Sequence, residues 1–146
     1  MKREDFPLRH RLRVRFVEVD RQGILHNSHY LVYFGIALNE YYRSLGYDRI
    51  AAGEAAGTAL HVVSAQVEYR APLMFDEEVE IAARISRLGR TSLTFAYAIF
   101  KDGRDDPAAT GQQVWVHTDK ATHKGTPWPE DLVALIAARE GEGLER

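Results

Sequence analysis

The sequence contains no cysteine. This absence excludes disulfide bonds, a thiolate nucleophile and a cysteine-based zinc site, so any chemistry has to use oxygen or imidazole groups. No apolar run approaches the roughly 20 residues that cross a bilayer, and residues 1–10 lack the apolar core of a signal peptide. We therefore expect a cytoplasmic protein that has no membrane partner.

An excess of charge of one sign is also missing. The 19 lysines and arginines nearly balance the 21 acidic residues, which leaves a net charge of -2. Such a chain has no field that would attract a polyanion, and we expect no nucleic-acid partner. With 146 residues, of which 45% are hydrophobic and 27% charged, the composition is typical of one globular domain spanning residues 1–146.

The N-terminal half predicts a strand followed by a helix. Residues 8–19 are β-branched, aromatic and charged in partial alternation, and a change of apolar parity predicts a bulge or a strong twist near Phe16. After the loop that begins at Asp20, apolar residues recur at helical spacing. Asn27 is the expected N-cap and Gly46 the expected stop, which gives a helix of about five turns.

After the small-residue segment AAGEAAGT, the pattern has period two. It predicts four strands, within residues 59–71, 78–86, 92–100 and 108–119. In the first of them, one face should carry His61, Val63, Ala65, Val67 and Tyr69. An amphipathic helix follows at about residues 128–139. This order predicts an α+β fold in which an antiparallel sheet wraps around a long central helix.

The loop before the long helix holds the candidate chemistry. Asp20 ends a strand, Gly23 allows a tight turn, and Asn27 and Ser28 lie at the helix start, where free N–H groups favour negative charge. A carboxylate next to such donors suits acyl transfer, with attack on a carbonyl and stabilisation of the oxyanion. The pattern is equally typical of an aspartate that only bonds the backbone of its own turn.

Two histidines accompany these residues. His26 and His29 lie at i, i+3 and could share a metal ion, but no third ligand is evident nearby, so we expect no metal and no cofactor. His26 could polarise a carbonyl or remain a neutral hydrogen-bonding group, while His29 is expected to face solvent or a subunit boundary. The sequence has no G-x-S-x-G elbow, phosphate loop or dinucleotide-binding motif.

The same stretch carries a family resemblance. The signature runs Asp20-x-x-Gly23-Ile24-Leu25-His26-Asn27-x-x-Tyr30-x-x-Tyr33-Phe34 and resembles the 4-hydroxybenzoyl-CoA thioesterase branch of hotdog-fold acyl-CoA thioesterases. The likeness continues through VEYRAPLMFDEEVEI and RLGRTSLTFAYAI and covers about residues 12–122. It implies a single hotdog domain with its core at about 8–122. It also implies homodimers, often assembled into homotetramers, with active sites between subunits.

The resemblance implies roles for individual residues. It implies hydrolysis of an acyl-CoA to a free acid and coenzyme A, with Asp20 as general base or nucleophile. The backbone N–H of Asn27 would polarise the carbonyl, and His26 joins the catalytic set although both side chains depart from those of many relatives. The implied substrate-binding residues are Gly23, Ser28, Tyr30, Arg87 and Arg90, with Lys120 and Lys124 as further phosphate-binding candidates.

Two other functions stay open at this point. A non-catalytic protein could hold an acyl thioester in the same groove without hydrolysing it. A hotdog hydratase or dehydratase would use a histidine and a carboxylate in proline- and glycine-rich surroundings, which GILHNSHY lacks. The acyl group and its carrier, coenzyme A or an acyl carrier protein, are also left open.

Overall fold

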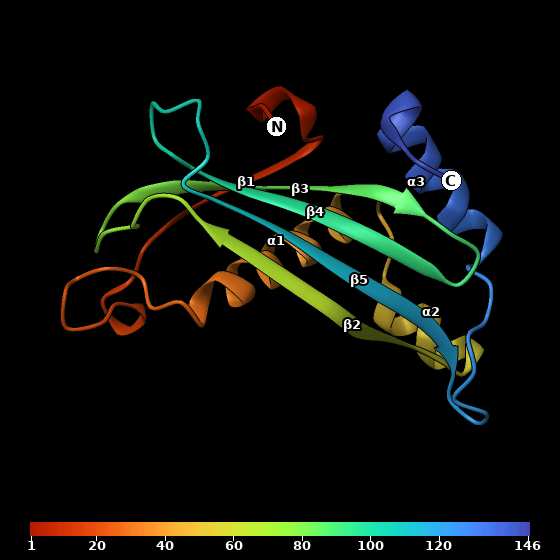
Figure 1. Ribbon diagram of the computed structural model, residues 1–146. Coiled ribbons are helices and arrows are strands. Elements are labelled where there is room, and N and C mark those ends of the chain that lie inside the picture. The colour runs from red at the N-terminus through yellow and green to blue at the C-terminus, as the bar shows by residue number, and fades with distance from the viewer.

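A computed structural model describes residues 1–146 as an α+β fold with one five-stranded antiparallel sheet, in the order β1-β3-β4-β5-β2 (Figure 1). The strands are β1 (Leu8–Arg13), β2 (Thr58–Tyr69), β3 (Glu78–Leu88), β4 (Ser92–Lys101) and β5 (Ala109–Asp119). The α-helices are α1 (His29–Ser44), α2 (Arg49–Ala56) and α3 (Glu130–Glu140). Short 3-10 helices cover Arg3–Asp5, Phe16–Glu18 and Gly141–Gly143. No helix has both the length and the apolar character to span a membrane.

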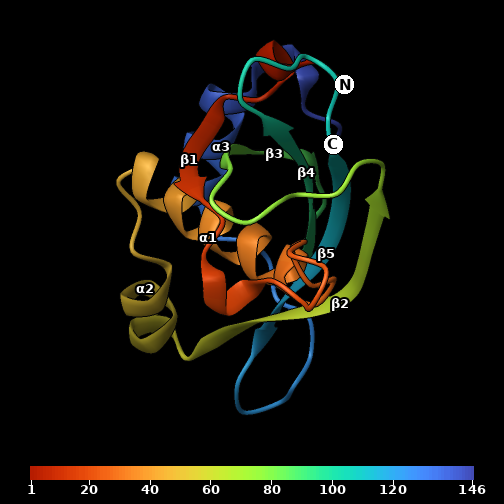
Figure 2. The same ribbon diagram turned by 90° about the vertical axis from the view of Figure 1, so that its left-hand side faces the viewer.

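The sheet curves around α1, and the core lies between them (Figure 2). The inward face of α1 carries Tyr33, Phe34 and Tyr41, which are fully buried. Phe34 stacks on Tyr97 of β4 with ring centroids 4.5 Å apart. Gly111 of β5 leaves room for the Phe34 ring, since a Cβ there would overlap it. This packing fixes the N-terminal end of α1 relative to the sheet.

A helix is present at the predicted place, but it is shorter than the long helix expected. It has 16 residues, begins at His29 and is preceded by Ser28 rather than by Asn27 in the capping position. The prediction of an Asn27 N-cap is therefore wrong, because residues 26–28 form a separate turn ahead of the helix. Gly46 adopts the positive φ of +69° just beyond the helix, as expected of a stop.

The first strand is shorter than the predicted range of 8–19. It ends at Arg13, and residues Phe16–Glu18 form a 3-10 turn instead of a bulge. Phe16 and Val17 are 79% and 75% exposed, so the change of apolar parity marks a turn that presents two apolar side chains to solvent. The turn is held by the carboxylate of Glu18, which accepts the Arg15 N–H at 2.9 Å.

One helix was not predicted, and one strand needs correction. The small-residue segment, for which the sequence predicted no structure, is mostly helix α2, which buries none of its residues and so has no apolar stripe to reveal it. In β2 a register shift between Val62 and Ser64 moves His61 to the face opposite Ala65. The four period-two segments and the C-terminal helix are confirmed as β2 to β5 and α3.

Candidate active site

The Asp20 turn follows the 3-10 helix and is closed by its own side chain. Asp20 Oδ1 accepts the Gln22 N–H at 2.8 Å, and the Asp20 carbonyl accepts the Gly23 N–H at 3.0 Å. Gly23 has a φ of +76°, which explains the choice of glycine. The structural role foreseen for Asp20 is thus present. Its second carboxylate oxygen has no hydrogen-bond partner and is free for chemistry.

The turn at 26–28 leaves one backbone donor unused. The Ser28 N–H donates to His26 Nδ1 at 3.2 Å, and the Ser28 Oγ lies 2.8 Å from the same nitrogen. Nδ1 therefore acts as the acceptor of the Ser28 N–H. The Asn27 N–H donates to no group of the protein. It can bind an incoming carbonyl oxygen at the N-terminal end of α1.

These groups meet at a pocket of about 440 Å³ between the turn and the end of β2. Its lining consists of Asp20, Ile24, Leu25, His26, Asn27, Tyr30, Tyr69, Arg70, Ala71 and Pro72. The Tyr30 and Tyr69 rings meet edge to face, 4.8 Å apart, and the Tyr69 hydroxyl donates to the Asn27 carbonyl at 3.3 Å. Burial raises the pKa of Tyr30, which keeps that phenol protonated.

Backbone bonds hold the pocket together. The Leu25 N–H donates to the Leu73 carbonyl at 2.7 Å, and the Phe75 N–H donates to the Gly23 carbonyl at 2.9 Å. These bonds fasten the turn to the chain that follows β2. Gly23 therefore shapes the site without lining it, and Ser28 uses its polar groups on His26.

A buried carboxylate that sequence reasoning missed supports the turn. Glu18 is 2% exposed, accepts the Tyr33 hydroxyl of α1 at 2.9 Å and pairs with Arg15 at 3.1 Å. Its carbonyl accepts the His26 N–H at 3.0 Å. Burial alone would raise the pKa of Glu18, but the hydrogen bonds from Arg15 and Tyr33 outweigh it and lower that pKa. In the sequence its place within an alternating charged stretch gave no sign of burial.

The structure places no third metal-ligating side chain with the two histidines. His29 is partly buried and its Nδ1 has no hydrogen-bond partner. No group of three or more histidine, cysteine or acidic side chains is arranged to hold a metal ion. His26 instead organises the turn before α1 through Ser28.

The basic residues predicted to bind phosphate do not lie at the Asp20 pocket. Arg87 and Arg90 flank the β3–β4 turn, and Lys120 and Lys124 lie in the nearby β5–α3 loop, at the end of the sheet where β2 begins (Figure 1). The Asp20 pocket is at the other end of β2, about 36 Å away for a 12-residue strand. One chain therefore does not bring these predicted residues together. Arg87 pairs with Glu145 at 3.6 Å, whereas Arg90 is exposed and has no acidic partner.

The sequence and the fold both have counterparts in known proteins. The sequence profile described as the thioesterase-like superfamily matches residues 14–136, from the end of β1 into α3. The chain belongs to the thioesterase-like superfamily. The match includes every residue that lines the Asp20 pocket of this thioesterase-like protein.

Individual relatives show the extent of the likeness. A protein of Aquifex aeolicus is 36% identical over 96 residues, which are 66% of this chain and 74% of that protein. A chloroplastic acyl-acyl carrier protein thioesterase of Arabidopsis thaliana is 29% identical over 109 residues, 72% of this chain and 56% of that protein. The crystal structure of a Thermus thermophilus thioesterase complexed with coenzyme A and zinc is 29% identical, with a TM-score of 0.80. That alignment covers 95% of this chain and 98% of the other.

The family resemblance drawn from the sequence is confirmed. This thioesterase-like chain has the hotdog fold and is a thioester hydrolase.

Proposed function

We propose that the protein hydrolyses an acyl-CoA to a free carboxylic acid and coenzyme A in the Asp20 pocket. One observation carries the proposal: an unpaired oxygen of Asp20 and the unpaired N–H of Asn27 border the same pocket although they come from separate turns. Coenzyme A in the Thermus thermophilus thioesterase supports the choice of carrier.

The two groups fit the two demands of the reaction. As general base, Asp20 would take a proton from water while the water oxygen attacks the thioester carbon; as nucleophile, its oxygen would attack that carbon directly. In both cases the carbonyl oxygen becomes negative and is held by the Asn27 N–H and the N-terminal end of α1. Collapse breaks the C–S bond and releases coenzyme A as a thiolate, which takes up a proton. In the general-base route this leaves the free acid directly. In the nucleophile route it leaves a mixed anhydride on Asp20, which water hydrolyses to the free acid and the Asp20 carboxylate.

Exchange of Asp20 for asparagine tests this role cleanly. Asparagine Oδ1 can still accept the Gln22 N–H, so the turn should persist while the base or nucleophile is lost. We expect Asp20→Asn to lower kcat by two or more orders of magnitude, measured by thiol release from short, long and aromatic acyl-CoAs and from acyl carrier protein thioesters. Asp105→Asn, in an exposed hairpin, is the matched control. Full activity of a folded Asp20→Asn protein would exclude the mechanism.

We further propose that the chain is a single hotdog domain, with its core at about residues 8–122, and that it works as a homodimer or homotetramer. Strand β2 forms one edge of the sheet, and its Val62 and Val63 are 48% and 61% exposed. An unpaired apolar edge favours pairing with a second strand. Antiparallel pairing of two β2 strands would place the β3–β4 turn of one subunit beside the Asp20 pocket of the other.

This assembly makes two variants informative. Val62→Lys should yield a monomer in sedimentation and lose activity, because it puts charge on the paired edge. Arg90→Gln should raise KM for an acyl-CoA several-fold while kcat stays unchanged, because Arg90 would bind phosphate of the substrate held by the partner. Arg9→Gln, an exposed arginine on β1, is the control. A fully active wild-type monomer would contradict the shared site.

A further inference from the structure

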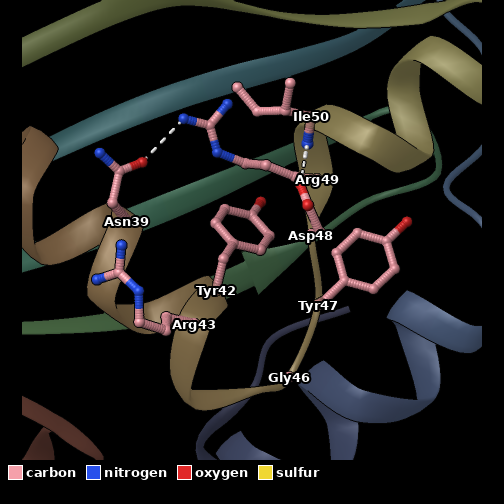
Figure 3. A pocket seen from close by; sticks show the side chains of 8 residues that line it. All are labelled: Asn39, Tyr42, Arg43, Gly46, Tyr47, Asp48, Arg49 and Ile50. Carbon is pink, nitrogen blue, oxygen red and sulfur yellow. Dashed lines mark hydrogen bonds between the residues drawn. The ribbon is translucent and has the colours of Figure 1, made fainter.

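A second pocket, of about 420 Å³, lies between the C-terminal half of α1 and the start of α2 (Figure 3). Its lining consists of Asn39, Tyr42, Arg43, Gly46, Tyr47, Asp48, Arg49 and Ile50. Twelve residues, mostly of α1, separate Asn39 from Asn27, which corresponds to about 18 Å of helix. Within one chain this pocket is therefore separate from the Asp20 pocket, and no residue lines both.

Arg49 presents a fixed positive charge to this pocket. Its Nη2 donates to Asn39 Oδ1 at 2.9 Å, and its guanidinium carbon lies 5.7 Å from the centroid of the Tyr42 ring. Both partners are neutral, and no carboxylate lies within salt-bridge distance of Arg49. The side chain is partly buried, so its remaining N–H donors are oriented without an anion to receive them.

Tyr42 supplies a second unused donor. The residue is 3% exposed and its hydroxyl makes no hydrogen bond within the protein, although it lines the pocket. Figure 3 shows this hydroxyl directed toward the side where Arg49 and Asp48 lie. Burial raises the pKa of Tyr42, which keeps the phenol protonated and able to donate. The oxygen itself is not sealed from solvent, so a ligand in the pocket can reach it.

The other ionic groups of the pocket are already engaged. Arg43 pairs with Glu40, and the Asp48 carboxylate caps α2 by accepting the N–H groups of Ile50 and Ala51. Arg49 is thus the one cationic side chain of the pocket without a salt-bridge partner. Because the Asp48 carboxylate also lines the pocket, a ligand with a single negative charge is favoured over one with more. A planar carboxylate matches the guanidinium fork.

We propose that this pocket binds the ionised form of a small carboxylic acid, held by Arg49 and the Tyr42 hydroxyl. The organic part would lie on the ring of Tyr47 and on Ile50, which is 60% exposed. Carboxylic acids are the compounds that thioester hydrolysis releases, so the ligand class rests on the proposed release of a free acid. The pocket is then a site for product at a distance from the chemistry.

Calorimetric titration of the full chain with benzoate and butyrate tests the proposal. At least one acid should bind, with neutral benzamide and inorganic phosphate weaker by about tenfold or more. Benzamide has no charge to pair with Arg49, and phosphate has no organic part to lie on Tyr47 and Ile50. Arg49→Gln should weaken binding by about tenfold or more, and the nearly isosteric Tyr42→Phe by about two- to tenfold. Arg9→Gln is the matched control and should bind like the wild type.

The Asp20→Asn protein separates this proposal from the catalytic one, since it should lose hydrolysis yet bind the acid with unchanged affinity. Three results would each overturn the carboxylate site. They are absence of binding of both acids to the folded wild type, equal binding by Arg49→Gln and wild type, and binding of phosphate or benzamide as tightly as of the acids.

Discussion

Replacing Glu18 tests whether one buried carboxylate holds the Asp20 turn onto α1. Glu18 is the only acidic side chain within the 3-10 helix that precedes Asp20, and it is 2% exposed. Its side chain bonds Tyr33 of α1 while its carbonyl bonds the His26 N–H. Loss of the carboxylate should therefore loosen the contact between the first turn and the helix that carries the Asn27 turn.

The size of the effect follows from the partners. A hydrogen bond to a charged group contributes about 1.5–3 kcal/mol, and the Tyr33 hydroxyl would be left buried without an acceptor. The pair with Arg15 adds little, because the arginine side chain is 69% exposed. We expect Glu18→Ala to lower the free energy of unfolding by about 2–3 kcal/mol. Glu18→Gln, which keeps an acceptor, should lower it by about 1–2 kcal/mol.

Urea unfolding followed by circular dichroism measures these changes. Tyr33→Phe and the double variant complete a cycle, and coupling of about 1–2 kcal/mol is expected if the two side chains interact. Glu4→Ala, at an acidic residue in the exposed N-terminal segment, is the control. A cost below about 0.5 kcal/mol for Glu18→Ala, or no coupling with Tyr33, would refute the reasoning.

We also expect the stability difference between the wild type and the Glu18 variants to depend on pH. Because the pKa of Glu18 is lowered in the folded protein, the unfolded chain binds its proton first as the pH falls. The stabilisation is complete above the ordinary carboxyl pKa of about 4.3 and is lost as the pH falls through the lowered folded value. The stability gap between wild type and Glu18→Gln should thus be full at about pH 7 and shrink below about pH 4. A gap that grows in acid would contradict the sign of the shift.

Two other predictions concern packing. Glu140→Ala should lower the free energy of unfolding in urea by about 2–4 kcal/mol. The Tyr41 hydroxyl and the Ile85 N–H, which lie 2.6 Å and 2.8 Å from Glu140 Oε1, would lose their acceptor. Glu142→Ala is the exposed control, and a Glu140→Ala protein as stable as the wild type would contradict this role. Gly111→Ala should lower the thermal midpoint at a cost of about 1–3 kcal/mol, because a Cβ would overlap the Phe34 ring. An unchanged midpoint would show that the ring moves freely.

The sequence foretold the order of elements because apolar periodicity reports which faces are buried. The prediction failed where the apolar pattern of the sequence does not follow burial in the structure. Helix α2 buries no residue and therefore left no stripe, while Phe16 and Val17 extended an apolar pattern into a turn that exposes them. The register shift in β2 depends on pairing with β5, which the sequence of one strand does not contain.

The candidate site, too, could be predicted from the sequence only in part. The Asp20 turn and the Asn27 turn are local, so the spacing of aspartate, glycine and helix start was enough to place them together. Tyr69 and Arg70 reach the pocket only through the fold, at the end of a 12-residue strand. Arg87 and Arg90 lie at the far end of the sheet. No pattern within one chain could show whether these residues of a second chain lie beside the Asp20 pocket of the first.

The Asp20 turn also bears on how this fold could change its activity over time. The turn needs only a hydrogen-bond acceptor at residue 20, and asparagine offers one as well as aspartate does. Folding therefore exerts no selection for the negative charge at that position, and under the proposed mechanism it is the reaction that preserves it. A descendant lineage released from hydrolysis could exchange the residue in a single step and retain an intact, ligand-sized pocket.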